Sequence, residues 1–424
     1  MRKKIHFIKL VGICLGLLLL LITPIQIKAA EKTDILISGL YDLTGPYSGV
    51  HQLFAKTAKD YVKWSNEQEL VPGANIILDI VDTGNEISKA VVAFQMAATK
   101  TPRAVLSTGG FSSSTVPACI PLAKRLKIPI VAGSSPRNIV LPPGWVFSVQ
   151  GCYEGMTAAF GDWVKANWKP DSSDPWIRAN YENRKPRLGI MGWDNAFGRA
   201  FDQKELRDYL ENIGVDFVGS EYIPLSPSDT TPQLVRLVKD KNADFLYFGM
   251  YPSSIGVILK DAARLGLLDD FQTCTFWASG LVQLQSYVKE LANRSMCLTG
   301  YKMMESEWEI PYFVKAFKES NLPAIFGMYY SGAAAYLDLY IEAIRRAAVK
   351  VGPDKVDGQA VYNALINMKN YQPRLYHSKC SFSETKRVGP DTAVIYQIQD
   401  GKQVLLEKDV YVPDILPGGK DVVK

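Results

Sequence analysis

The sequence has few of the side chains that most often carry catalysis or bind metal ions. It contains three histidines, His6, His51 and His377, and its six cysteines form no CxxC pair and no Cys/His set with zinc spacing. It also contains no GxSxG, HExxH, P-loop or GxGxxG motif. Because no catalytic constellation is visible, we predict a protein that is not an enzyme and that uses no metal and no cofactor.

The sequence also lacks an excess of one charge once its first 29 residues are set aside. It has 48 Lys and Arg against 43 Asp and Glu, and residues 1–29 contain five basic side chains and no acidic one. Subtraction leaves 43 basic against 43 acidic residues. This balance gives no reason to expect a nucleic acid or an anionic membrane surface as a partner.

The one long hydrophobic run stands near the amino end. Positions 1–9 include four basic residues, Arg2, Lys3, Lys4 and Lys9. Residues 10–22 are apolar throughout, and Ile27-Lys28-Ala29 follows. The run is shorter than the roughly 20 residues that span a bilayer, and the pattern is typical of a secretory signal peptide cut after Ala29. Cys14 follows Ile13, where a lipobox needs a small residue. We therefore expect a soluble periplasmic protein without a lipid anchor.

Export would permit disulfide bonds, but the cysteine count argues against a disulfide scaffold. Five cysteines remain after residue 29, an odd number that leaves at least one thiol unpaired. Cys274 and Cys297 each lie in a short strand-like run of the same half of the chain. If any pair forms, we expect it to be this one.

Strand and helix patterns alternate after the signal segment, which predicts an α/β fold with parallel sheets and right-handed crossovers. About 395 residues suit two domains of ordinary size. The expected strands cover 34–40, 75–81, 104–107, 145–149, 188–192, 215–222, 244–248, 272–277 and 296–302. The expected helices cover 50–66, 87–99, 155–167, 197–212, 232–239, 254–265, 281–292 and 329–350, with a shorter one near Val361 and β-hairpins over 376–412.

The boundary between the two domains is marked by a new start of the strand pattern after Gly151 and by a polar segment, residues 168–186, with three prolines. This segment joins a helix to the following strand. Ligand-facing loops of a parallel sheet follow the carboxyl ends of strands instead. We therefore expect residues 168–186 to be a surface loop away from any binding crevice.

Two polar clusters suggest where a ligand would bind. Ser112, Ser113 and Ser114 precede a predicted helix, whose N-terminal amides and hydroxyls could hold a small anion. Ser134 and Ser135 follow the next short strand and should face the same crevice. An ordinary capped helix is the alternative explanation of the first cluster.

Several motifs follow the predicted strands in order: Leu43-Thr44-Gly45-Pro46, Ser112-Ser113-Ser114-Thr115 with Pro117-Ala118, Ile128-Pro129, Trp193 to Gly198, and Asp244 to Gly249. The ordered set resembles the branched-chain amino acid type of periplasmic solute-binding protein, which serves ABC importers. The resemblance implies two Rossmann-like lobes joined by three crossovers that close on a solute, the type I fold. It places lobe 1 at 33–150 and 303–373, lobe 2 at 151–302 and 374–415, a tail at 416–424, and crossovers near Gln150, 298–303 and 371–375.

The resemblance also suggests site residues one at a time. Ser112, with Ser113 beside it, matches the position whose hydroxyl holds a ligand carboxylate. Ser134, followed by Ser135, falls where a backbone group contacts the ligand's amine, although Pro136 replaces a usual threonine. The family's aromatic lining implies similar roles for Phe197, which replaces a Tyr, and for Tyr251, Tyr47 and Phe326. Packing in the core is the alternative for each of these rings.

Ser279 departs most clearly from the family pattern. Amino-acid binders carry an acidic residue in the turn after this strand, where it pairs with the ligand's ammonium. A buried ammonium without such a partner would be costly. Either Asp194, Asp82 or Glu305 substitutes, or the solute is a carboxylate or amide with an apolar or aromatic body held by Trp193, Trp277, Tyr47 and Tyr251.

The resemblance implies a monomeric solute-binding component that delivers a small carboxylate-bearing solute to an ABC permease in the inner membrane. Two alternatives stay open. The same binder could report its solute to a membrane receptor. An amide hydrolase acting through Ser112 is the enzyme alternative, but the sequence offers no base for it.

Overall fold

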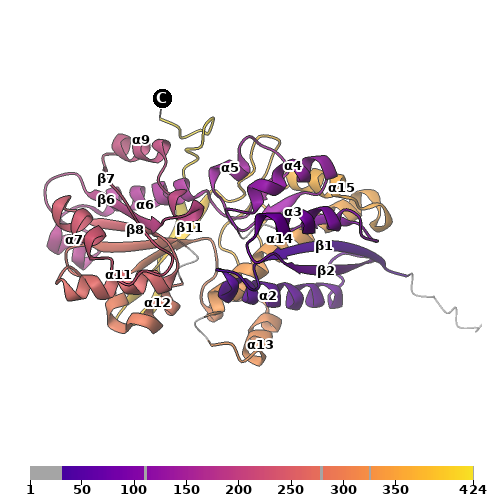
Figure 1. Ribbon diagram of the computed structural model, residues 1–424, viewed down its shortest axis with the longest axis horizontal. Coiled ribbons are helices and arrows are strands. Elements are labelled where there is room, and N and C mark those ends of the chain that lie inside the picture. Colours follow the sequence, from indigo (N-terminus) through magenta and orange to yellow (C-terminus); the bar gives the residue numbers. More distant parts are fainter. Residues whose placement is uncertain (1–30, 109–111, 277–279, 324–325, 424) are drawn as a thin grey trace, which may run out of the picture. The chain divides into compact units, whose positions relative to one another are not determined.

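The computed structural model describes residues 31–108, 112–276, 280–323 and 326–423 (Figure 1). The predicted signal peptide and the residues Trp277 and Ser279 therefore lie outside the described residues. Residues from Thr33 onward form one unit. Within the described ranges, no helix combines the length and the apolar character that crossing a membrane requires.

The first of two sheets is entirely parallel, with strand order β2-β1-β3-β4-β5. Hydrophobic residues dominate its central strands, as expected for a sheet covered on both faces. The strands are β1 (Thr33–Tyr41), β2 (Ala74–Asp82), β3 (Ala104–Ser107), β4 (Ile130–Ala132) and β5 (Val146–Ser148). The helices of this first lobe are α2 (Ser48–Glu67), α3 (Ile87–Ala97), α4 (Val116–Leu126), α5 (Arg137–Val140), α13 (Pro311–Glu319), α14 (Gly327–Val351) and α15 (Gly358–Ile366).

The second sheet has the order β12-β11-β10-β9-β8-β6-β7, in which a C-terminal hairpin adds two antiparallel strands to a parallel sheet. The strands are β6 (Arg187–Trp193), β7 (Asp216–Ile223), β8 (Phe245–Gly249), β9 (Gln272–Phe276), β10 (Met296–Thr299), β11 (Thr392–Gln399) and β12 (Lys402–Tyr411). The helices of this second lobe are α6 (Tyr153–Asn167), α7 (Pro175–Asn180), α8 (Ala196–Arg199), α9 (Lys204–Ile213), α10 (Thr231–Leu234), α11 (Pro252–Arg264) and α12 (Leu281–Val288). A π turn (Val235–Asp240) extends α10, and short 3-10 turns cover Lys289–Ala292, Glu305–Glu307 and Pro353–Lys355.

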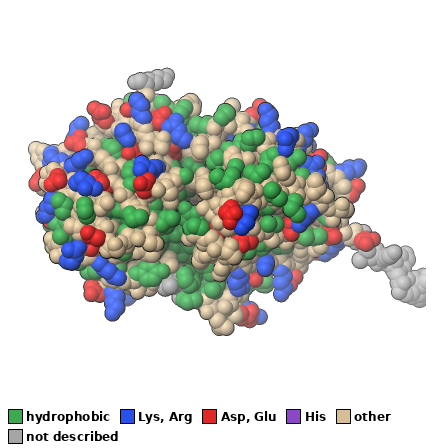
Figure 2. All heavy atoms as spheres, viewed as in Figure 1, with side chains coloured by type: hydrophobic (Ala, Val, Ile, Leu, Met, Phe, Trp, Pro, Cys, Tyr) green, Lys and Arg blue, Asp and Glu red, His purple; other side chains and the backbone are tan. Residues whose placement is uncertain are grey.

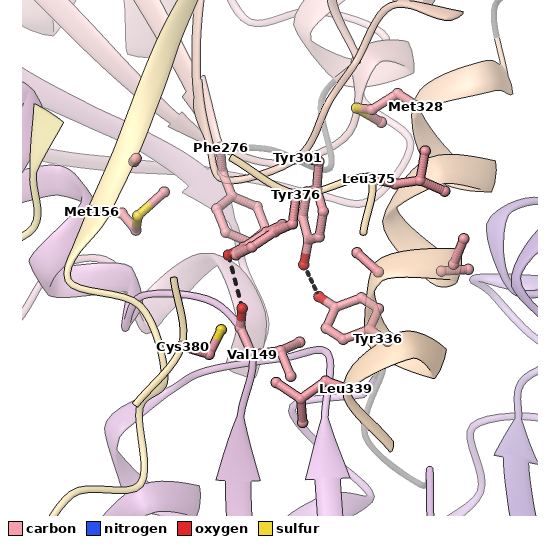
Figure 3. Packing of buried hydrophobic residues seen from close by; sticks show 14 of the residues in the cluster. Val149, Met156, Phe276, Tyr301, Met328, Tyr336, Leu339, Leu375, Tyr376 and Cys380 are labelled. Carbon is pink, nitrogen blue, oxygen red and sulfur yellow. Dashed lines mark hydrogen bonds between the residues drawn. The ribbon is translucent and has the colours of Figure 1, made fainter. Parts of the chain in front are cut away.

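The α/β prediction with two lobes is confirmed, and the chain passes between the lobes after β5, after β10 and before β11 (Figure 1). Figure 3 shows tyrosines that join these passages. The Tyr376 hydroxyl donates to the Val149 carbonyl at 2.8 Å. The Tyr301 hydroxyl bonds that of Tyr336 in α14, which in turn donates to the Gly133 carbonyl at 3.1 Å. The passages are therefore tied to one another and to the end of β4.

The polar segment at 168–186 differs from the predicted surface loop. Trp168 and Trp176 are buried and pack their rings against Phe245. The Trp176 indole N–H donates to the Asp269 carbonyl at 2.8 Å, and α7 occupies the middle of the segment. Since Phe245 is the first residue of β8, the segment covers the end of the sheet opposite to the strand ends that could bind a ligand.

The favoured disulfide is wrong. All five described cysteines, including Cys274 and Cys297, are free and buried. The register pairs Cys274 with Met296 and Cys297 with Thr275. Because successive side chains of a strand point to opposite faces, the two thiols face opposite sides of the sheet.

Candidate functional site

A cavity of about 230 Å³ lies where the carboxyl ends of strands from both sheets meet. Residues that follow β1 to β4 line it from one side. The first residue of α6 and the residues that end or follow β6 to β9 line it from the other. The lining residues are Pro46, Tyr47, Phe54, Asn85, Ser112, Ser113, Ser114, Gly133, Ser134, Tyr153, Asn195, Ala196, Phe197, Leu225, Tyr251 and Phe276. Strand carboxyl ends are where open α/β sheets bind ligands, so this cavity is the candidate site.

The turn after β1 presents Tyr47. The buried carboxylate of Asp42 accepts hydrogen bonds from the Gly45 amide at 2.5 Å and the Tyr47 amide at 2.8 Å. The Tyr47 ring stands edge-on to that of Tyr251 in the second lobe, with centroids 6.0 Å apart. Its hydroxyl accepts a long hydrogen bond, 3.4 Å, from the side-chain amide of Asn195. Tyr47 thus bridges the two sides of the cavity.

The serine cluster forms a hydrogen-bonded network with Asn85. The Ser112 hydroxyl donates to the Asn85 side-chain oxygen at 2.5 Å, and the Ser114 hydroxyl donates to the same oxygen at 3.1 Å. The Ser112 oxygen also accepts from the Ser114 and Thr115 amides at 3.2 and 3.3 Å. Ser112 therefore caps the turn before α4 while it lines the cavity.

Ser134 differs from the other serines because its hydroxyl is buried without a partner among the described residues. Ser134 follows β4, is 4% exposed, and lines the cavity. A buried hydroxyl without a hydrogen bond destabilises a protein by about 1–3 kcal/mol. A bound solute that supplies an acceptor or donor would remove this cost.

Aromatic rings form the opposite wall. Tyr153 stacks on Phe201 with centroids 4.6 Å apart, and its edge meets Phe197 at 5.4 Å and Phe276 at 5.0 Å. Burial raises the pKa of the Tyr153 and Tyr251 phenols above their ordinary value, so both stay neutral hydrogen-bonding groups. Such a wall suits an apolar or aromatic part of a solute.

The motif at 193–198 shows how the sequence places Phe197 in this wall. The Asn195 side chain accepts from the Gly198 amide at 3.0 Å and so caps α8. A Cβ atom at Gly198 would collide with the backbone of Trp193, so glycine is required for α8 to lie this close to β6.

No charged side chain lines the cavity within the described ranges. The three acids considered as ammonium partners are engaged elsewhere. Asp82 accepts from the Leu43 and Gly84 amides, Asp194 pairs with Arg199, and Glu305 lies near Lys318.

On the face drawn in Figure 2, acidic and basic side chains are interspersed. The described ranges contain no cluster of three His, Cys, Asp or Glu side chains placed to hold a metal ion.

The structure brings six of the predicted site residues to the cavity: Tyr47, Ser112, Ser113, Ser134, Phe197 and Tyr251. Three others lie outside its lining. The Ser135 hydroxyl donates to the Gly151 carbonyl. The Trp193 ring packs against Tyr47 and Tyr251, and its indole N–H donates to the Ser254 hydroxyl. Phe326 packs on Tyr329. Ser279 lies outside the described residues.

The sequence-based site missed several lining residues, chiefly Asn85, Tyr153, Asn195 and Phe276. Asn85 follows β2, so the rule that strand ends face the crevice could have found it. Tyr153 begins α6, where its apolar periodicity identifies it only as a core residue.

Comparison with known proteins identifies a matching protein family. Residues 34–403 match the family model described as periplasmic binding protein. No curated protein matches the sequence.

Solved structures share the fold at low sequence identity. A branched-chain amino acid ABC transporter protein from Thermus thermophilus with bound valine is 19% identical, with a TM-score of 0.76 over 91% of this chain and 97% of that one. An extracellular ligand-binding receptor from Rhodopseudomonas palustris is 17% identical, with a TM-score of 0.72 over 89% and 100%. A fatty acid ABC transporter substrate-binding protein from Thermomonospora curvata is 16% identical, with a TM-score of 0.70 over 91% and 94%.

Proposed function

The chain belongs to the periplasmic binding protein family, and we propose on that basis that it is the extracytoplasmic solute-binding component of an ABC importer. The similarity to binding proteins of ABC transporters over nine-tenths of the chain supports this proposal. The signal peptide predicted over residues 1–29 would export the chain to the periplasm. A permease of the inner membrane would receive the solute from the monomeric binder.

The proposed solute has a carboxylate or amide head, an apolar or aromatic body, and no ammonium group. The observation that carries this choice is the composition of the cavity, which combines hydroxyl and amide groups with aromatic rings and has no carboxylate among its described lining residues. A buried ammonium in such a cavity would lack a charged partner. The relative from T. curvata is described as a fatty acid transporter protein, which gives a precedent for an acid without an ammonium.

Closure would trap the solute between the lobes. The loops that carry Ser112, Ser113 and Ser134 belong to the first lobe and would meet the head group first. Phe197 and Tyr251 belong to the second lobe and would cover the body as the lobes approach, which excludes water and strengthens the polar contacts. Binding then shifts the population toward the closed form, which the permease recognises.

A thermal-shift screen of the purified mature protein tests this function, because a binder is stabilised by its own solute. The panel contains amino acids, short aliphatic acids, aromatic acids and the corresponding amides. We expect the melting temperature to rise with acids or amides and to stay unchanged with leucine and valine. A rise confined to leucine or valine would contradict the proposed solute class.

Transport is tested in the source cells by deleting the gene and measuring uptake of the solute found in the screen. Loss of that uptake, with uptake of an unrelated solute unchanged as the control, supports the importer. Unchanged uptake combined with loss of a transcriptional response to the same solute would favour a sensory role.

A further inference from the structure

The hydrogen bonds around Ser112 leave its hydroxyl no proton for a solute. Its oxygen has two lone pairs, which accept from the Ser114 and Thr115 amides at 3.2 and 3.3 Å. Its single proton is donated to the Asn85 side-chain oxygen at 2.5 Å, and the Ser114 oxygen lies 2.8 Å away. All hydrogen-bonding groups of the Ser112 hydroxyl are therefore used by neighbouring residues of the protein.

The same network fixes the orientation of the Asn85 amide. Both side-chain hydrogen bonds that described residues make to Asn85 go to its oxygen, from Ser112 and from Ser114. An amide whose oxygen accepts two hydroxyl protons presents its NH2 group on the other branch. Asn85 lines the cavity, so this NH2 group is available to a solute there.

The backbone at this position also suits asparagine. Asn85 has a φ of 59°, in the left-handed region that asparagine enters more readily than most other residues. The residue lies in the turn between β2 and α3, directly before Glu86 and the first turn of α3. The turn therefore holds the side chain at the carboxyl ends of β2 and β3, beside the serine cluster.

We propose that Asn85 is the residue that selects the solute's head group, and that Ser112 and Ser114 position it. This inference rests on the proposed function, since it concerns the same cavity. An NH2 donor attracts a carboxylate or carbonyl oxygen and offers nothing to an ammonium, which has only donors itself. The Ser134 hydroxyl has no partner among the residues that the structure describes, so the first lobe has two groups that can meet an oxygen of the head.

Asn85→Asp is the sharpest test, because it keeps the shape and the acceptor for Ser112 and Ser114 but replaces the NH2 donor with a charged acceptor. Three probes share one body: 3-phenylpropanoate, 3-phenylpropanamide and 3-phenylpropylamine. Calorimetry at neutral pH measures each affinity. We expect the variant to bind the carboxylate roughly ten- to hundredfold more weakly than the wild type, and to bind the amine better than the wild type does.

Asn370→Asp is the matched control. Asn370 also has a positive φ, 49°, and its side-chain oxygen also accepts from a serine hydroxyl, that of Ser381, but it does not line the cavity. Its substitution should leave all three affinities unchanged. Ser114→Ala should weaken carboxylate binding, and Ser114→Thr, which keeps the hydroxyl, should restore it, as expected for a positioning residue.

The outcomes separate this inference from the proposed function. Equal carboxylate affinity of the wild type and Asn85→Asp, with both folded, would overturn the role of Asn85 and leave the solute class standing. Binding of none of the three probes by the wild type, or of the amine alone, would contradict the solute class and the inference together.

Discussion

Arg137 of α5 and Glu205 of α9 form a bidentate ion pair between the lobes, with Nη1 to Oε2 at 2.5 Å and Nη2 to Oε1 at 2.9 Å. Along the chain, α5 connects β4 and β5 of the first sheet, and α9 lies between β6 and β7 of the second. Both side chains are about a quarter exposed, so water screens the attraction in part. The pair stabilises the arrangement in which the two lobes are together.

Glu205→Gln should therefore weaken solute binding without touching the cavity. Losing a partly exposed pair of this geometry costs about 1 kcal/mol, which is roughly a fivefold loss of affinity if it acts on closure. The matched control is Glu221→Gln, because Glu221 makes a similar bidentate pair with Arg236 inside the second lobe. Calorimetry on both variants decides, and equal affinities would show that the Arg137 pair has no part in closure.

Ser134→Ala should separate a binding role from a structural one. The variant removes a buried hydroxyl that no described residue bonds, so the solute-free protein should be as stable as the wild type or more stable. If Ser134 donates to a charged head group, the variant should lose about 1.5–3 kcal/mol of the free energy of solute binding. Ser135→Ala is the control, since its hydroxyl donates to the Gly151 carbonyl and its loss should lower stability. Reduced stability of Ser134→Ala with unchanged affinity would contradict the assignment.

Glu154 should make stability depend on pH. Its carboxyl group is buried in α6, its oxygens have no hydrogen-bond partner among the described residues, and burial raises its pKa from 4.5 to about 7 although Arg137 lies 4.0 Å away. Because the folded state holds this proton more tightly than the unfolded state, the free energy of unfolding falls as pH rises through this window. The shift corresponds to a loss of about 3 kcal/mol by neutral to mildly alkaline pH.

Glu154→Gln, which cannot ionise, should remove that loss. Urea unfolding at about pH 5 should give similar stabilities for the variant and the wild type, and at about pH 8 the variant should be the more stable. The difference between the two profiles isolates Glu154 from other titrating groups, including Glu205 and Cys152 beside it. Parallel profiles across this range would show that Glu154 is ionised in the folded protein throughout.

Periodicity predicted the regular elements well and their interruptions poorly. The strand at 104–107 and the long helix at 327–351 were found because each has a continuous pattern. The helix expected over 197–212 is divided into α8 and α9, because Phe201 turns into the core between them. No local pattern shows where a side chain far away in the sequence will need such a break.

The sequence predicted site residues that follow the strands of a lobe. It did not predict roles that depend on a contact between side chains of two different loops. The serines and the aromatic residues after β6 and β8 were found in this way. The role of Asn85 was missed because it depends on a contact with Ser112, 27 residues further along the chain. The same contact gives the Ser112 proton to a neighbouring side chain, which the motif alone cannot reveal.

The central claim is that the cavity holds a solute without an ammonium, and calorimetric titration of two matched pairs tests it most directly. The pairs are 3-phenylpropanoate with phenylalanine and 4-methylpentanoate with leucine, whose members differ only in the α-ammonium. The account predicts that at least one acid binds, and binds at least about tenfold more tightly than its amino acid, since the ammonium would be buried unpaired. Tighter binding of phenylalanine or leucine than of the matching acid would contradict it.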